Sequence, residues 1–180
     1  MLLKTPQARV VNVSSNRHMS GTIDFDNLDG SRDYERWRAY GQSKLANLLF
    51  AYELQRRFVS AGVDAISIGC HPGYAATNLQ FVGPQMSHSR SQELLYKLAN
   101  RFIAQSAAMG ALPVLYAAVD PDVAGGDYIG PLGRGHMRGY PGKNRSSERS
   151  YDVEAARRLW QVSTQMTGVA YKELENVVGA

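Results

Sequence analysis

The sequence has a single cysteine, so no disulfide can form within the chain. A lone thiol fits a reducing compartment, and we predict a cytoplasmic location. No apolar run approaches the roughly 20 residues of a transmembrane helix, and no membrane span is predicted. The histidines lack the spacing of metal ligands, so no metal site is predicted either. They are His18, His71, His88 and His136.

The composition is that of one folded domain. Of the 180 residues, 44% are hydrophobic, which is enough for a packed core. Neither an internal repeat nor a dividing linker is present. The net charge is +4, and several cations crowd one glycine-rich stretch: Arg134, Arg138, Lys143, Arg145 and Arg149. Such a cluster can attract nucleic acid. Because no stacking platform or recognition helix accompanies it, we predict a solvated loop and no nucleic-acid partner.

Hydrophobic periodicity in the first half predicts a strand, a helix and a second strand. The strands cover residues 8–15 and 63–69, and a long polar excursion over residues 16–36 leads to a helix over residues 37–60. The predicted apolar stripe of that helix consists of Leu45, Leu48, Leu49, Tyr52 and Phe58. Two strands joined by such a helix favour a parallel, right-handed βαβ unit.

The second half is predicted to be less regular. In order, the pattern favours a loop over 74–90, a helix over 91–103, a helix from Ser106 to Val119, a strand over 127–130, irregular chain over 131–150 and an amphipathic helix over 152–167. Gly110 and Pro113 argue against an uninterrupted second helix. The inward face predicted for the last helix consists of Val153, Ala156, Leu159, Trp160 and Met166.

Tyr40 and Lys44 are the most informative pair of residues. Four residues apart on a helix, they lie on one face. An ammonium beside a phenol favours the phenolate, and such a tyrosine can exchange a proton with a substrate oxygen. The first strand ends at Ser14-Ser15, and Pro72-Gly73 follows the second. Each piece alone also has an ordinary explanation, namely a solvated helix face, a strand end and a turn.

Together and in this order, these segments resemble the catalytic half of a short-chain dehydrogenase/reductase. The stretch Ser43-Lys44-Leu45-Ala46-Asn47, with the long segment between serine and tyrosine, narrows the resemblance to the retinol-dehydrogenase-like and protochlorophyllide-reductase-like branch. The resemblance implies an α/β fold, the carboxyl-terminal part of a doubly wound parallel-sheet (Rossmann-like) domain. It also implies that the amino-terminal cofactor half, with its glycine-rich loop, is absent from this chain. Whether the chain is a piece of a longer protein or has a misassigned start stays open.

The resemblance also implies a reaction and a set of site residues. Hydride would move between NAD or NADP and a carbonyl or alcohol carbon. Tyr40 would be the general acid or base, Lys44 would promote its ionisation and bind the nicotinamide ribose, and Ser15 would orient the substrate oxygen. The further cofactor contacts would be Pro72, Gly73, Ala75 and Thr77. The choice between NAD and NADP is not readable, because the selecting residues lie upstream in this family.

As a single partial domain, residues 1–180 would include a substrate lid over 74–104 and a carboxyl-terminal loop and helix over 131–180. The lid carries apolar residues, which favours a lipophilic small-molecule substrate, although they could also simply pack the lid. Relatives often use the tyrosine helix at a subunit interface, so a homo-oligomer is possible. The alternative function is that of a truncated or inactive member acting as a non-enzymatic interaction module.

One glycine pattern could be mistaken for a cofactor loop. Gly133, Gly135 and Gly139 have spacing reminiscent of a dinucleotide fingerprint, which works only when the glycines open a helix. Turn residues, Tyr140-Pro141-Gly142, follow instead. We therefore predict that this stretch binds no dinucleotide.

Overall fold

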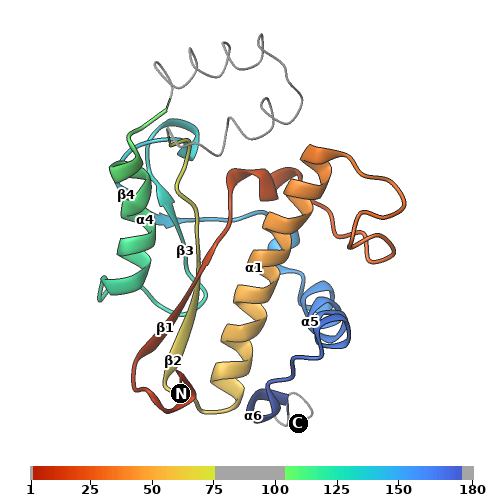
Figure 1. Ribbon diagram of the computed structural model, residues 1–180. Coiled ribbons are helices and arrows are strands. Elements are labelled where there is room, and N and C mark those ends of the chain that lie inside the picture. Colours follow the sequence, from red (N-terminus) through yellow and green to blue (C-terminus); the bar gives the residue numbers. More distant parts are fainter. Residues whose placement is uncertain (1, 76–103, 176–180) are drawn as a thin grey trace.

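The structure, a computed structural model, describes residues 2–75 and 104–175 and contains a four-stranded sheet (Figure 1). Its strands are β1 (Ala8–Val13), β2 (Ala65–Cys70), β3 (Tyr128–Pro131) and β4 (Pro141–Asn144), in the spatial order β1-β2-β3-β4. The first three are parallel and β4 is antiparallel. Strand β1 is therefore an edge strand whose neighbour in this sheet is β2. The predicted α/β fold with a parallel sheet is confirmed.

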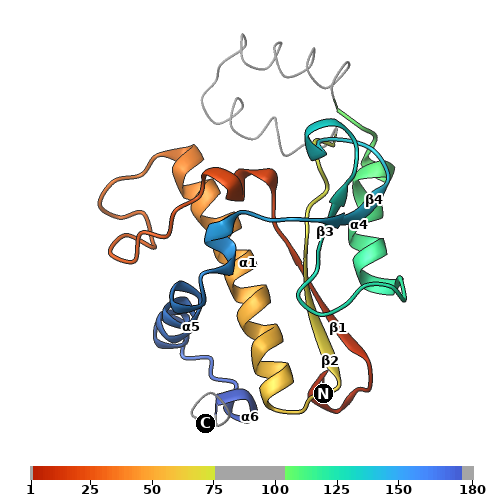
Figure 2. The same cartoon turned by 180° about the vertical axis from the view of Figure 1, so that it is seen from behind.

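Helices cover both faces of this sheet. The α-helices are α1 (Arg36–Ser60), α4 (Ala107–Val119), α5 (Val153–Thr167) and α6 (Lys172–Glu175), and the 3-10 helices are η1 (Leu2–Lys4), η2 (Asn16–Ser20), η3 (Arg134–His136) and η4 (Glu148–Tyr151). Figures 1 and 2 show α1 and α4 on opposite sides of the sheet, with α5 beside α1. The predicted helix over 37–60 is thus confirmed as α1.

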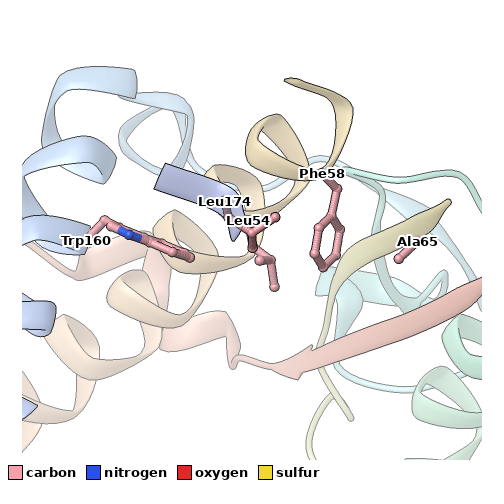
Figure 3. Packing of buried hydrophobic residues seen from close by; sticks show 5 residues of the cluster. All are labelled: Leu54, Phe58, Ala65, Trp160 and Leu174. Carbon is pink, nitrogen blue, oxygen red and sulfur yellow. The ribbon is translucent and has the colours of Figure 1, made fainter. Parts of the chain in front are cut away.

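Alternation along the strands explains this two-sided packing. Ala65 of β2 packs toward α1, in a cluster with Leu54, Phe58, Trp160 and Leu174 (Figure 3). On the other face, Ile68 and Cys70 pack with Ala117 of α4 and with Ile129. The Cys70 thiol is fully buried, and burial raises its pKa to about 12. Cys70 is therefore a small core residue.

Side chains of the preceding residues begin the helices. The Glu35 carboxylate accepts the Trp37 and Arg38 N–H groups at the start of α1, and the Ser106 hydroxyl accepts the Met109 N–H at the start of α4. Helix α4 continues through Pro113 to Val119, so the two residues that argued against its continuity do not interrupt it. Its Gly110 lies so close to Ala75 that a Cβ there would be 2.6 Å from the Ala75 Cβ.

Two sequence-based expectations are wrong. Residues 131–150 are not irregular, because they contain β4, which pairs with β3 from Tyr128↔Asn144 to Pro131↔Pro141, and two 3-10 helices. Met166 does not face inward, since its exposed fraction is 63%. Six residues along α5 place it about 120° around the helix from the buried Trp160. The helix predicted over 91–103 lies outside the described residues.

Within the described ranges, 2–75 and 104–175, no helix combines the length and the apolar character needed to cross a membrane.

Candidate active site

The candidate site lies where β1 and β2 end. The strands run parallel, and the last pair in register is Val13 and Cys70. Ser14 continues the pairing, because its N–H donates to the Cys70 carbonyl at 2.7 Å. Ser15 and the turn that begins at Pro72 therefore emerge at the same edge of the sheet. Ligand sites of open α/β sheets lie at this carboxyl edge.

Three hydrogen bonds attach the end of β1 to α1. The buried Ser14 hydroxyl donates to the Lys44 carbonyl at 2.8 Å. The Lys44 ammonium and the Asn47 amide donate to the Val13 carbonyl, at 3.4 and 2.9 Å. The Lys44 Nζ also lies 5.6 Å from the centroid of the Tyr40 ring. Lys44 thus stands beside both Tyr40 and the end of the serine strand.

The two serines differ in what their hydroxyls can do. The Ser14 hydroxyl proton is engaged by Lys44. The Ser15 oxygen instead accepts the Arg17 N–H at 3.3 Å, as the cap of η2. That bond uses a lone pair and leaves the hydroxyl proton for a ligand. The local geometry therefore favours Ser15 over Ser14 as the residue that would meet a substrate oxygen.

The turn that follows Ser15 rests directly on the part of α1 that carries Tyr40. Gly21 ends this turn, and a Cβ there would overlap the Gly41 carbonyl oxygen. Tyr40 is partly buried, and its ring makes an edge contact with Trp37 at 6.4 Å between centroids. The contacts bring the elements of Ser15, Tyr40 and Lys44 together, and their joint catalytic role stays a prediction.

The turn after β2 is packed against the loop that contains Gly133, Gly135 and Gly139. The Tyr74 N–H donates to the Met137 carbonyl at 2.7 Å, and Gly73 has a left-handed φ of 68°. A Cβ at Gly73 would overlap the Met137 oxygen. The loop itself forms the three-residue η3, and β4 follows, so its glycines do not open an α-helix of the dinucleotide-binding kind.

Gln105 ties this turn together and was missed from the sequence. Its buried side-chain amide donates to the Pro72 carbonyl at 2.8 Å and accepts the Gly139 N–H at 3.0 Å. Its backbone forms a parallel bridge with Ala75. No local pattern marks a single glutamine as buried, whereas Asn47 stood inside the stretch that carried the family resemblance. Asn47 and Gln105 both bind backbone groups at the site, Asn47 at the end of β1 and Gln105 at the turn after β2.

Some predicted site features cannot be placed. Thr77 and most of the predicted lid, residues 76–103, lie outside the described residues. Pro72, Gly73 and Ala75 lie at the carboxyl end of β2, as expected for residues beside a cofactor, and their contact with one stays a prediction.

A mostly parallel sheet covered on both faces, with hydroxyl, phenol and amine groups near its carboxyl edge, defines an α/β domain of the Rossmann-like class. The comparisons with known proteins narrow this class. No protein-family model matches the chain. Individual relatives do match over nearly its whole length.

Retinol dehydrogenase 12 of Mus musculus is 34% identical over 173 residues, which are 95% of this chain and 49% of that protein. Retinol dehydrogenase 13 of Homo sapiens is 36% identical, over 90% of this chain and 46% of that protein. A short-chain dehydrogenase/reductase, prx1, of Penicillium roqueforti is 31% identical over 91% of the chain and 48% of its own length. A crystal structure of an uncharacterized protein from Mycobacterium paratuberculosis is 36% identical, with a TM-score of 0.71, over 92% of this chain and 52% of its own.

Over nearly its whole length, the chain is similar to retinol dehydrogenases and to a short-chain dehydrogenase/reductase, at 31–36% identity. It spans about half the length of the curated relatives it matches, in agreement with the predicted carboxyl-terminal half of such a domain.

Proposed function

We propose that the protein containing this chain is an NAD(P)-dependent oxidoreductase that interconverts a carbonyl and an alcohol. The observation that carries the proposal is the position of Lys44, whose ammonium lies beside the Tyr40 ring and donates to the Val13 carbonyl, two residues before Ser15. The relatives that match the chain are named dehydrogenases, which supports the same reaction class.

The donor groups of the site suit a nicotinamide nucleotide. The Lys44 ammonium has three protons, and the hydrogen bond found for it uses one of them, on the Val13 carbonyl. The others would bind the ribose hydroxyls. Pro72, Gly73 and Ala75, with Thr77, would border the nicotinamide. When bound, the nicotinamide would supply or accept the hydride.

The chain's own residues would handle the proton. In reduction, Tyr40 would donate its phenolic proton to the substrate oxygen, and in oxidation the ionised phenol would take it back. The Ser15 hydroxyl would donate a hydrogen bond to the same oxygen and so hold it near Tyr40. Lys44 would keep its ammonium beside the Tyr40 ring while it binds the nucleotide.

The substrate is proposed to be lipophilic. Matched relatives are named retinol dehydrogenases and a polyprenol dehydrogenase. The cytoplasmic location and the homo-oligomer remain predictions.

Replacement of the phenolic hydroxyl tests the proposal. In the complete gene product, Tyr40→Phe should lower turnover by about 10²- to 10⁴-fold, because it removes the proton donor. It should leave nicotinamide nucleotide binding largely intact. Tyr34→Phe is a matched control, since Tyr34 is exposed and lies in the loop before α1, and it should turn over like wild type. A Tyr40→Phe enzyme that keeps wild-type turnover would refute the assignment.

A further inference from the structure

The His18 ring is buried beside Ser15 and has one possible protonation pattern. Its exposed fraction is 1%. The Nε2 atom lies 3.0 Å from the Ser147 backbone N–H, which can only donate, so Nε2 carries no proton. The proton is therefore on Nδ1, which donates to the Ser15 carbonyl at 2.7 Å. Burial lowers the pKa of His18, which keeps the ring neutral.

The Ser147 end of this link is held rigidly. The Ser146 hydroxyl lies 2.7 Å from both the Tyr52 hydroxyl and the Ser150 hydroxyl. The Ser150 hydroxyl donates to the Ser147 carbonyl at 2.6 Å. Tyr52 belongs to α1, the helix that also carries Tyr40 and Lys44. The N–H that binds His18 is thus anchored to the helix of the proposed catalytic pair.

Aromatic neighbours fix the plane of the His18 ring. Tyr128 of β3 makes an edge contact with His18 at 5.3 Å between ring centroids, and its hydroxyl lies 3.4 Å from the His18 Nδ1. The Tyr128 ring also stacks on His71. No carboxylate forms an ion pair with His18 among the residues that the structure describes. The ring is therefore held by neutral contacts.

The segment that contains Ser147 and Arg149 also holds the far end of the turn from Ser15 to Gly21, called here the serine turn. Arg149 donates to the Gly21 carbonyl at 3.0 Å, while His18 connects Ser147 with Ser15 at its near end. Without the imidazole, the Ser15 carbonyl would keep the His18 backbone N–H at 3.0 Å as its partner. That single bond leaves more freedom to the peptide that sets the direction of the Ser15 hydroxyl.

We infer that His18 is a positioning residue, which fixes the Ser15 hydroxyl relative to Tyr40 and Lys44 by linking the Ser15 carbonyl to the Ser147 N–H. The inference rests on the proposed function, because it assigns His18 a role through Ser15. It goes beyond that function, since it makes the segment after β4 part of the apparatus that orients the substrate.

Two conservative variants separate the two ends of the link. His18→Asn places an amide donor near the position of Nδ1, so it can keep the bond to Ser15 and loses the bond to Ser147. His18→Gln reaches toward Ser147 and loses the bond to Ser15. In the complete gene product, His18→Gln should lower kcat about 10- to 100-fold with little change in KM for the nucleotide. His18→Asn breaks the same link at its other end, so it should also lower kcat, by a comparable factor. A wild-type kcat in either variant would overturn the inference.

Two further measurements keep the outcomes distinct. Ser15→Ala and Tyr40→Phe are measured in the same turnover assay. If both keep wild-type turnover, the proposed function is refuted, whatever the His18 variants show. If the His18 variants do not fold, nitrogen-15 NMR of the wild-type imidazole decides. A protonated Nδ1 and an unprotonated Nε2 near neutral pH support the link, and the opposite tautomer overturns it.

Discussion

Lowering the pH from 7 to 5 should destabilise the fold through His71. This imidazole follows β2 directly and has an exposed fraction of 1%. Its Nδ1 accepts the Gly73 N–H at 3.2 Å, so the proton of the neutral ring is on Nε2. The Nε2 atom is buried and has no hydrogen-bond partner among the described residues. A second proton would therefore replace the Gly73 bond with a buried charge.

Burial, together with smaller effects of the nearby His18 and His136, lowers the pKa of His71 to about 4. The unfolded chain keeps a pKa near 6.5, so between pH 6.5 and 4 it binds more protons than the native state. Stability is therefore highest above pH 6.5 and falls as the pH drops toward 4. At about 1.4 kcal/mol per pH unit, the 1.5 units from 6.5 to 5 give about 2 kcal/mol.

Urea unfolding at pH 7 and pH 5, followed by circular dichroism, measures this loss. His71→Asn should remove about 2 kcal/mol of the pH dependence, because the amide cannot be protonated in this range yet can still accept the Gly73 N–H. His71→Leu is the control, since it removes both the titration and the acceptor. It should show the same reduced pH dependence and lower stability than Asn at both pH values.

The reasoning would be refuted if His71→Asn lost as much stability between pH 7 and pH 5 as the wild type does. A pKa above 6 for the His71 ring in an NMR titration of the native protein would refute it independently, because the buried ring would then be protonated without penalty.

Two further predictions follow from the packing, and a third follows from the share of its relatives that the chain spans. Glu53→Ala should lower the free energy of unfolding by about 3–5 kcal/mol, because it leaves the buried Arg57 guanidinium without the carboxylate that binds it at 2.8 Å. Glu148→Ala is the control, since it removes an exposed pair with Arg145 and should change the thermal midpoint little. Gly21→Ala should cost about 1–3 kcal/mol and slow turnover by pushing the serine turn off α1, whereas Gly62→Ala meets no atom within 4 Å and should leave turnover unchanged. The 180-residue chain alone should bind no NADPH at micromolar concentrations, and a micromolar fluorescence titration would contradict this.

Much of the architecture could be predicted from local patterns. The apolar stripe from Leu45 to Phe58 placed α1, and the β-branched runs placed β1 and β2, because each pattern reflects a repeat of a few residues. Strand β4 was not predicted, because Pro141 and Gly142 are poor strand formers. They pair with β3 only in the folded sheet. Met166 was placed inward by its apolar character, although its direction around α5 turns it to solvent.

For the site, local patterns alone predicted that Tyr40 and Lys44 share one helix face and that Ser15 and Pro72 follow neighbouring strands. Helical and strand periodicity act over a few residues, so these relations are written locally. Three contacts became visible only in the folded chain. The Ser14 hydroxyl donates to the Lys44 carbonyl, the Gln105 amide binds the Pro72 carbonyl, and His18 accepts the N–H of a residue 129 positions away. Such contacts depend on how distant segments pack, and no local repeat encodes them.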